Sequence, residues 1–167
     1  MQIDIKKAAA RISGQVLQTP LFYSKYLSAL NKGQVYLKLE NEQYTGSFKA
    51  RGALNKILGL SSSEKAKGLI TASTGNHAQG FARALEIANA EGTIFLPTNA
   101  EASKVEALKA YKVGLQFHGA DALTTELHAM KFAEASGQIW ISPYNDPEVI
   151  AGQGTLALEM TSQLDSI

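Results

Sequence analysis

The sequence predicts an α/β fold, in which a parallel sheet carries helices on both faces. Short apolar runs alternate with amphipathic stretches of helical length, and this alternation is typical of βαβ units. No repeat or low-complexity segment interrupts it, and no linker is long enough to separate independent domains. In such a sheet each strand ends beside the start of a helix, where ligands usually bind.

The expected strands and helices follow one another along the chain. The strands are the apolar runs Leu69-Ile70-Thr71-Ala72, Thr93-Ile94-Phe95-Leu96, Leu115-Gln116-Phe117 and Ile139-Trp140-Ile141. Apolar spacing predicts helices through Ala78–Leu85, over residues 102–111, from the N-cap Asp121 to Gly137, and over residues 147–163. Before them we expect a helix over residues 4–17, a strand over residues 34–40, a turn over residues 44–47, and a helix over residues 47–58 with Ser47 as its N-cap.

The composition narrows the class of protein. A chain of 167 residues fits one ordinary domain or two small lobes, and its 45% hydrophobic and 19% charged content is that of a soluble globular protein. A net charge of +1 without a long basic run argues against a nucleic-acid partner. The absence of cysteine excludes disulfides, thiolate metal sites and cysteine nucleophiles. No stretch reaches the roughly 18 apolar residues of a membrane helix, and residues 1–12 lack the apolar core of a signal peptide. We therefore expect a cytoplasmic protein with no membrane partner.

The run Ser47-Phe48-Lys49-Ala50-Arg51-Gly52-Ala53 places a lysine in the first turn of an expected helix. Burial and the positive end of a helix both favour the neutral, nucleophilic form of a lysine amine. Phe48 is well placed to lie against a flat ring. A solvated lysine on a helix surface is the competing interpretation, and the heptapeptide alone favours it because most lysines are exposed.

A second run, Ser73-Thr74-Gly75-Asn76-His77-Ala78-Gln79-Gly80, joins an expected strand to a helix. Ser73 or Thr74 can cap the helix, Gly75 allows unusual dihedral angles, and free N–H groups at a helix start attract anions. A phosphate or an amino-acid carboxylate suits this loop, and Asn76 can bracket a phenolic oxygen. The alternative is a capped turn that binds nothing.

Other site types fit this sequence poorly. The loop has neither the G-x-G-x-x-G pattern nor a P-loop, which argues against a nucleotide enzyme. The histidines His77, His118 and His128 have no metal-ligand spacing with acidic residues, so we expect no metal site. Ser73 and His77 lack a nucleophile elbow and an orienting acid, which argues against a hydrolase. The two runs together instead suggest a lysine able to form a Schiff base beside an anion site, as in a pyridoxal-phosphate (PLP) enzyme that acts on amino acids.

With both runs considered, the chain resembles the threonine/serine dehydratase (threonine ammonia-lyase) branch of the fold-type-II PLP enzymes, the tryptophan synthase β-like superfamily. The resemblance covers nearly the whole chain and includes Thr19-Pro20-Leu21, Leu37-Lys38-Leu39-Glu40-Asn41, Gln43-Tyr44-Thr45-Gly46 and Gly152-Gln153-Gly154-Thr155. The cysteine synthase branch typically has Asn-Pro before its lysine and Lys-Asp-Arg at it, and this chain has neither. Thr74 departs from the dehydratase pattern, which often has alanine at that position.

The resemblance implies the following roles. Lys49 forms a Schiff base with PLP and moves the proton at the substrate Cα, and Phe48 packs on the cofactor ring. Asn76 binds the 3′-oxygen of the cofactor. Ser73, Thr74, Gly75 and His77, with nearby backbone amides, form the substrate-binding loop around the carboxylate. The reaction expected is the conversion of L-threonine or L-serine to a 2-oxo acid and ammonia, in amino-acid metabolism and specifically in isoleucine biosynthesis.

The resemblance also implies an architecture. Residues 1–52 belong to a large PLP lobe, residues 53–144 form the small α/β lobe, and residues 145–167 form a helix that returns to the large lobe. Members of this family are much longer, and their second half carries a glycine-rich loop for the PLP phosphate, whereas this sequence has no Gly-Gly run. We therefore expect an incomplete large lobe, from a truncated or split protein that has little activity alone.

Two alternatives stay open. The chain can be a non-catalytic remnant or subunit, since a half-domain with an unpaired sheet edge exposes apolar surface that a partner chain can cover. It can also be a serine racemase-like enzyme, which keeps the same lysine but needs a second acid/base that we expect outside this chain. The expected partners are a small hydroxy amino acid and either further copies of the chain or a complementing C-terminal half.

Overall fold

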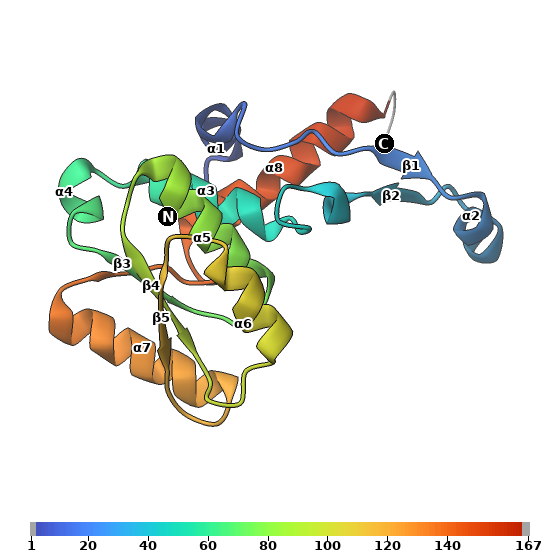
Figure 1. Cartoon of the computed structure of the whole chain (residues 1–167). Helices are drawn as coiled ribbons and strands as arrows, with labels where there is room; N and C mark the ends of the chain where they lie inside the picture. Colours follow the sequence, from blue (N-terminus) through green and yellow to red (C-terminus); the bar gives the residue numbers. More distant parts are fainter. Residues whose placement is uncertain (1–2, 165–167) are drawn as a thin grey trace.

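The computed structural model describes residues 3–164, and a four-stranded parallel sheet in the order β5-β4-β3-β6 lies at its centre. Its strands are β3 (Leu69–Ala72), β4 (Gly92–Leu96), β5 (Gly114–Phe117) and β6 (Ile139–Trp140). The helices between them are α5 (Asn76–Ala88), α6 (Ala102–Lys109) and α7 (Ala122–Ser136), as Figure 1 shows. The predicted alternation of strands and helices is therefore confirmed.

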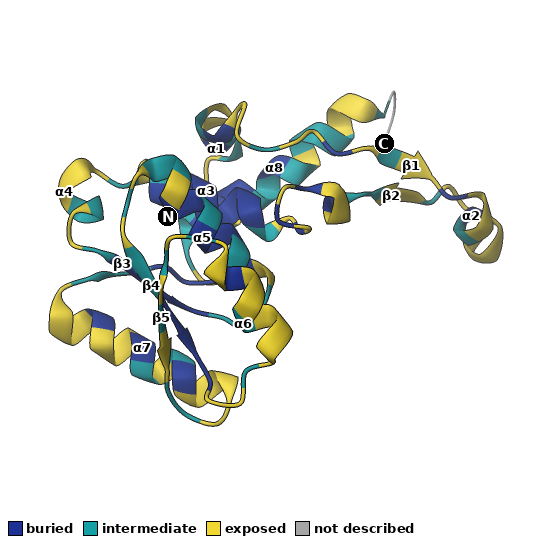
Figure 2. Cartoon of the chain, viewed as in Figure 1, coloured by how far each residue is buried: buried dark blue, intermediate teal, exposed yellow. Residues whose placement is uncertain are grey.

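Side chains from the two faces of the sheet build two hydrophobic clusters, because successive residues of a strand point to opposite sides. Leu69 and Ile94 pack with Phe81 of α5 in the larger cluster. Ile70 and Phe95 pack with small residues of α7 in the other. Buried residues accordingly follow the central strands β3 and β4, α5 and the inner stripe of α7 (Figure 2). The prediction of helices on both faces is confirmed.

Two glycines allow the helices α3 (Lys49–Gly59) and α8 (Pro147–Gln163) to cross closely. A Cβ on Gly52 would lie 2.5 Å from Nε2 of Gln153 and 2.8 Å from the carbonyl oxygen of Val149. A Cβ on Gly152 would lie 2.6 Å from the carbonyl oxygen of Arg51. Only glycine permits this contact, which holds α8 against the start of α3. The expected lobe boundary between residues 52 and 53 falls inside α3, which contacts both α5 and α8.

The first forty residues differ from the prediction in several places. The first helix, α1 (Ile5–Ile12), is shorter than expected because Ser13 leaves the helical region and Gly14 has a φ of +74°. Asp4 caps this helix by accepting a hydrogen bond of 2.9 Å from the N–H of Lys7. The expected strand over residues 34–40 is shortened to β2 (Tyr36–Lys38), because a 3₁₀ turn begins at Glu40.

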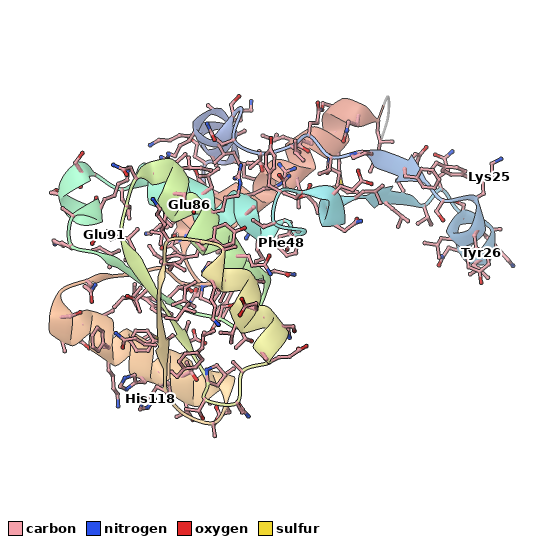
Figure 3. All side chains as sticks on the ribbon, in the orientation of Figure 1. Lys25, Tyr26, Phe48, Glu86, Glu91 and His118 are labelled. Carbon is pink, nitrogen blue, oxygen red and sulfur yellow. The ribbon has the colours of Figure 1, made fainter. Side chains whose placement is uncertain are left out.

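Among residues 3–164, the sequence prediction missed four elements, whose signals are weak or non-local. The strand β1 (Leu21–Tyr23) pairs antiparallel with β2, and α2 (Lys25–Asn31) joins these strands. Together they form an arm that extends away from the sheet, with Lys25 and Tyr26 at its far end (Figure 3). The other two are the 3₁₀ turn (Glu40–Glu42) and the short helix α4 (Ser62–Lys65).

The remaining helix ends agree with the prediction to within a few residues. The helix α7 begins after its N-cap Asp121 and is followed by Gly137, whose φ is +72°, and α8 has the expected bounds. The helix α6 ends at Lys109, two residues before the expected end. Ser47 is not the N-cap of α3: Phe48 already has helical dihedral angles, and the Ser47 hydroxyl accepts from the N–H of Lys49 at 3.2 Å. Within residues 3–164, no helix is long and apolar enough to cross a membrane.

Candidate active site

A cavity of about 410 Å³ lies at the carboxyl ends of β3 and β4. The predicted site residues Lys49, Ser73, Thr74, Asn76 and His77 all line it. Lysine and loop are far apart in the sequence, and the structure brings them together because α3 packs against α5. A Cβ on Gly80 of α5 would lie only 3.0 Å from the carbonyl oxygen of Lys49, which shows how closely these helices approach.

The Lys49 side chain is half-buried, and its amine is bonded to the chain rather than fully solvated. Its Nζ donates a hydrogen bond of 2.8 Å to the carbonyl oxygen of Pro143, in the loop after β6. Burial lowers the pKa of Lys49 below its ordinary value, which increases the fraction of neutral amine. The interpretation of Lys49 as a solvated surface lysine does not agree with this geometry.

A buried arginine fixes the start of α3 and so positions Lys49. The Arg51 side chain has no exposed surface and donates hydrogen bonds of 2.6–2.9 Å to the carboxylates of Glu40 and Glu159. It also donates to the carbonyl oxygen of Leu17 at 3.0 Å. Arg51, two positions after Lys49, thus connects the start of α3 to the segments that contain Leu17, Glu40 and Glu159. Charge-assisted, bidentate hydrogen bonds of this kind are among the strongest in proteins.

The N-terminus of α5 forms another part of the cavity lining. Gly75 is its N-cap, with φ and ψ of −130° and −143°, and no side chain caps the helix. Neither Ser73 nor Thr74 is therefore the cap that the sequence predicted; the Ser73 hydroxyl accepts from the N–H of Gly75 at 3.3 Å. The first-turn N–H groups of α5 stay free of intrahelical partners, and no acidic residue lies in that turn. This end of the cavity therefore attracts anions.

His77 is held in one neutral form beneath this loop. The Thr71 hydroxyl donates its single proton to the carbonyl oxygen of Ile141 at 2.8 Å. The contact of 3.1 Å between Thr71 Oγ1 and His77 Nε2 therefore requires the proton to be on Nε2. Burial, and secondarily the charge of Lys49, lower the pKa of His77 to about 3. The ring thus carries no positive charge, and a ligand carboxylate would be met by backbone N–H groups instead.

Two predicted residues, Phe48 and Gly75, do not line the cavity. The Phe48 side chain is 39% exposed, and its ring centroid lies 5.5 Å from Lys49 Nζ at the start of α3 (Figure 3). Gly75 lies in the loop between lining residues. The structure also adds lining residues that the sequence did not suggest, among them Phe95, Thr125, Glu126, Pro143 and Tyr144. No local motif marks them, because they lie in β4, in the first turns of α7 and in the loop after β6, which only the sheet brings together.

Fold and site together define a class. A partly desolvated lysine lies beside a helix N-terminus, at the carboxyl ends of parallel strands, where ligands of such sheets bind. An amine of this kind forms Schiff bases with carbonyl compounds, and the helix start attracts an acidic group. The site is that of an enzyme with a carbonyl-bearing cofactor or substrate.

Comparison with known proteins identifies the family. The chain belongs to the family of pyridoxal-phosphate dependent enzymes, which it matches over residues 12–167. L-threonine dehydratase catabolic TdcB of Escherichia coli (strain K12) is 42% identical over 161 residues, which cover 96% of this chain and 49% of that protein. The family predicted from the sequence is confirmed.

Solved structures agree with this assignment. Serine racemase from Dictyostelium discoideum matches with a TM-score of 0.89 at 33% identity, covering 98% of this chain and 53% of that one. The processed form of threonine deaminase isoform 2 from Solanum lycopersicum matches with a TM-score of 0.88 at 36% identity, covering 98% and 46%. The chain spans about half the length of the relatives that it matches.

The residues present fit the family's cofactor, PLP. The cofactor carries an aldehyde, for which the half-buried amine of Lys49 is a suitable nucleophile, and its ring oxygen suits the side-chain amide of Asn76. Both residues line the cavity of about 410 Å³. This chain can therefore provide the covalent attachment point and one polar contact to the ring.

Proposed function

We propose that this chain provides the lysine-bearing half of a PLP-dependent ammonia-lyase that converts L-threonine or L-serine to a 2-oxo acid and ammonia. The observation that carries the proposal is the Lys49 amine, held by the Pro143 carbonyl at 2.8 Å in the same cavity as the α5 loop. The similarity to the Escherichia coli protein with a threonine dehydratase name supports the choice of reaction.

In this proposal each residue has a separate task. Lys49 binds the cofactor and then moves the proton at the substrate Cα, a role suited to an amine whose pKa is lowered by burial. The loop of Ser73, Thr74, Gly75 and His77 binds the substrate carboxylate through the N-terminus of α5. Asn76 orients the cofactor through its ring oxygen, and Phe48 packs on the ring. PLP, when bound, supplies the electron sink for the reaction.

We further propose that the chain acts with a complementing C-terminal half or as a homo-oligomer, in the cytoplasm. The proposed lobes are residues 1–52, 53–144 and 145–167, with the site between the first two. The match covers 49% of the relative's length. The proposed setting is amino-acid metabolism; the isoleucine-biosynthetic role rests on the sequence resemblance alone, since the relative's name says catabolic.

Borohydride trapping of PLP tests the attachment point. The chain is incubated with PLP, reduced and digested, and the modified lysine is identified by mass spectrometry. We expect modification mainly at Lys49 and its loss in Lys49→Ala. The matched control is Lys109→Ala, because the Lys109 side chain is 60% exposed in an ion pair on α6. Equal labelling of Lys49 and exposed lysines would contradict the proposal and favour a non-catalytic subunit.

Activity is measured after mixing the chain with a separately expressed C-terminal half of the relative. We expect 2-oxo acid formation from L-threonine to require both halves and Lys49. Formation of D-serine from L-serine would favour the serine racemase-like reading, which the match to the Dictyostelium discoideum enzyme supports. The two products are separated by chiral chromatography, so one reaction mixture distinguishes lyase from racemase.

A further inference from the structure

One wall of the cavity is formed by Thr125 and Glu126 of α7 and by Tyr144, which follows Pro143 in the loop after β6. The Tyr144 hydroxyl donates a hydrogen bond of 2.5 Å to Oε1 of Glu126. Tyr144 is adjacent to the residue whose carbonyl holds the Lys49 amine. We call these three residues the acceptor wall.

None of the three side chains has a proton free for a ligand. The Tyr144 proton is directed at Glu126, and this hydrogen bond, together with burial and the carboxylate charge, raises the pKa of Tyr144. The single proton of the Thr125 hydroxyl is directed within the chain, because the carbonyl oxygens of His118 and Asp121 both lie 2.7 Å from its oxygen. Glu126, when ionised, can only accept hydrogen bonds. The wall therefore presents lone pairs and a negative charge.

Two other parts of the cavity lining, the start of α5 and Lys49, have the reverse character. The first turn of α5 offers N–H donors, and Lys49 adds a cationic or neutral amine. The neighbouring N-terminus of α7 does not compete for anions, because the Asp121 carboxylate accepts from the N–H of Thr124 at 2.8 Å. A dipolar ligand is thus oriented, with its carboxylate at α5 and its side chain toward the acceptor wall.

We infer that Glu126 and Tyr144 determine specificity: they select amino acids whose side chain ends in a hydrogen-bond donor, such as a hydroxyl, and reject acidic amino acids. This inference rests on the proposed function, because it assumes that the cavity holds the amino-acid substrate. A hydroxyl can donate to Glu126 or to the free lone pairs of Tyr144. A side-chain carboxylate has no proton to donate and meets the charge of Glu126, which at about 4 Å is expected to weaken binding by roughly tenfold or more.

Nuclear magnetic resonance titration measures this preference without relying on turnover. The ¹⁵N-labelled chain, with PLP present, is titrated with L-serine, O-methyl-L-serine and L-aspartate, and the backbone amides of Gly75 and Asn76 report binding. We expect L-serine to bind at least about tenfold more tightly than L-aspartate. O-methyl-L-serine, which keeps the oxygen but lacks the proton, is expected to bind about threefold to tenfold more weakly than L-serine.

Variants connect the preference to the wall. Glu126→Gln removes the charge and adds a donor, so the ratio of L-serine to L-aspartate affinity should fall by about tenfold. Tyr144→Phe removes an acceptor but keeps the charge, so serine binding should weaken while aspartate stays excluded. The matched control is Glu134→Gln, on the exposed side of α7, which changes the net charge equally and should leave the ratio unchanged.

The outcomes separate the inference from the proposed function. Equal binding of serine and aspartate, an unchanged ratio in Glu126→Gln, or no response to any amino acid would each overturn the inference. If Lys49 is trapped by PLP in the same samples, the proposed attachment survives that result. If Lys49 is not trapped, the proposed function fails independently of the titrations.

Discussion

The substitution Arg51→Met tests how the site is held in place. Arg51 is fully buried and donates to both carboxylate oxygens of Glu40, which is only 8% exposed. Methionine keeps the apolar stem but leaves Glu40 without its main counter-charge. Glu159 keeps a partner, because Lys38 Nζ lies 2.6 Å from its Oε2. The variant therefore creates one uncompensated buried carboxylate rather than two.

Removing one partner of a buried ion pair costs about 3–5 kcal/mol, and we expect the lower half of this range because Glu159 stays paired. At a urea dependence of about 2 kcal/mol per molar, a loss of about 3–4 kcal/mol lowers the unfolding midpoint by roughly 1.5–2 M. Unfolding is followed by far-ultraviolet circular dichroism and by the fluorescence of the single tryptophan, Trp140. The control Lys109→Met removes an exposed ion pair and should cost less than about 1 kcal/mol.

Two further variants keep this test decisive. Arg51→Lys retains the charge without the bidentate geometry and should be less destabilised than Arg51→Met, so it can be measured if the methionine variant does not fold. The double variant Glu40→Gln with Arg51→Met should recover about 1 kcal/mol or more, because the charge is no longer buried unpaired. A loss below about 1 kcal/mol in Arg51→Met, or no recovery in the double variant, would refute this account of the network.

Three other predictions follow from the packing and the polar contacts. Gly52→Ala should destabilise the chain by about 1–3 kcal/mol in urea unfolding, because its Cβ would lie 2.5 Å from Gln153, whereas Gly33→Ala, whose nearest contact is 3.8 Å away, should cost much less. Burial alone raises the pKa of Glu40, but hydrogen bonds from Arg51 and Thr19 and nearby positive charges outweigh it and lower the pKa below 4.5. The stability that Glu40 contributes is therefore present above about pH 4.5 and lost as the pH falls through its folded-state pKa. Between about pH 7 and pH 3, the free energy of unfolding should therefore depend less steeply on pH in Glu40→Gln than in the unchanged chain. Thr71→Val should cost about 1–3 kcal/mol, because it removes the hydrogen bonds that Thr71 makes to the Ile141 carbonyl and to the His77 ring. An unchanged ¹⁵N spectrum of the His77 ring would contradict the assigned tautomer.

Much of the fold could be predicted because its signals are local. The apolar strands, the N-cap Asp121, the proline at the start of α8 and the glycine after α7 act through neighbours a few residues away. The elements missed were those whose stability depends on distant partners or on few residues. The strand β1 has three residues and exists by pairing with β2, and α4 has one turn.

The same division applies to the site. The loop and the lysine were recognisable because each belongs to a short continuous run whose residue types can be identified from the sequence. The helix caps were misassigned, since Ser47 and Ser73 both bond two residues ahead rather than capping the helix. No sequence pattern pointed to Glu126 and Tyr144 as site residues. They are 18 residues apart, and they meet only because α7 packs on the sheet close to the loop that follows β6.

The sequence by itself determined the alternation of strands and helices from β3 onward, the family, and the two runs that contain Lys49 and the loop before α5. Only the tertiary structure decided that Lys49 is partly desolvated and bonded to Pro143, that Arg51 bonds to Glu159, 108 positions away, and which other side chains line the cavity with the loop. The physical reason is the distance along the chain between interacting residues. Hydrogen bonds within a turn or helix cap join residues that are close in the sequence, so the local residue types predict them. Burial and charge pairing depend on which distant segments the closed core brings into contact.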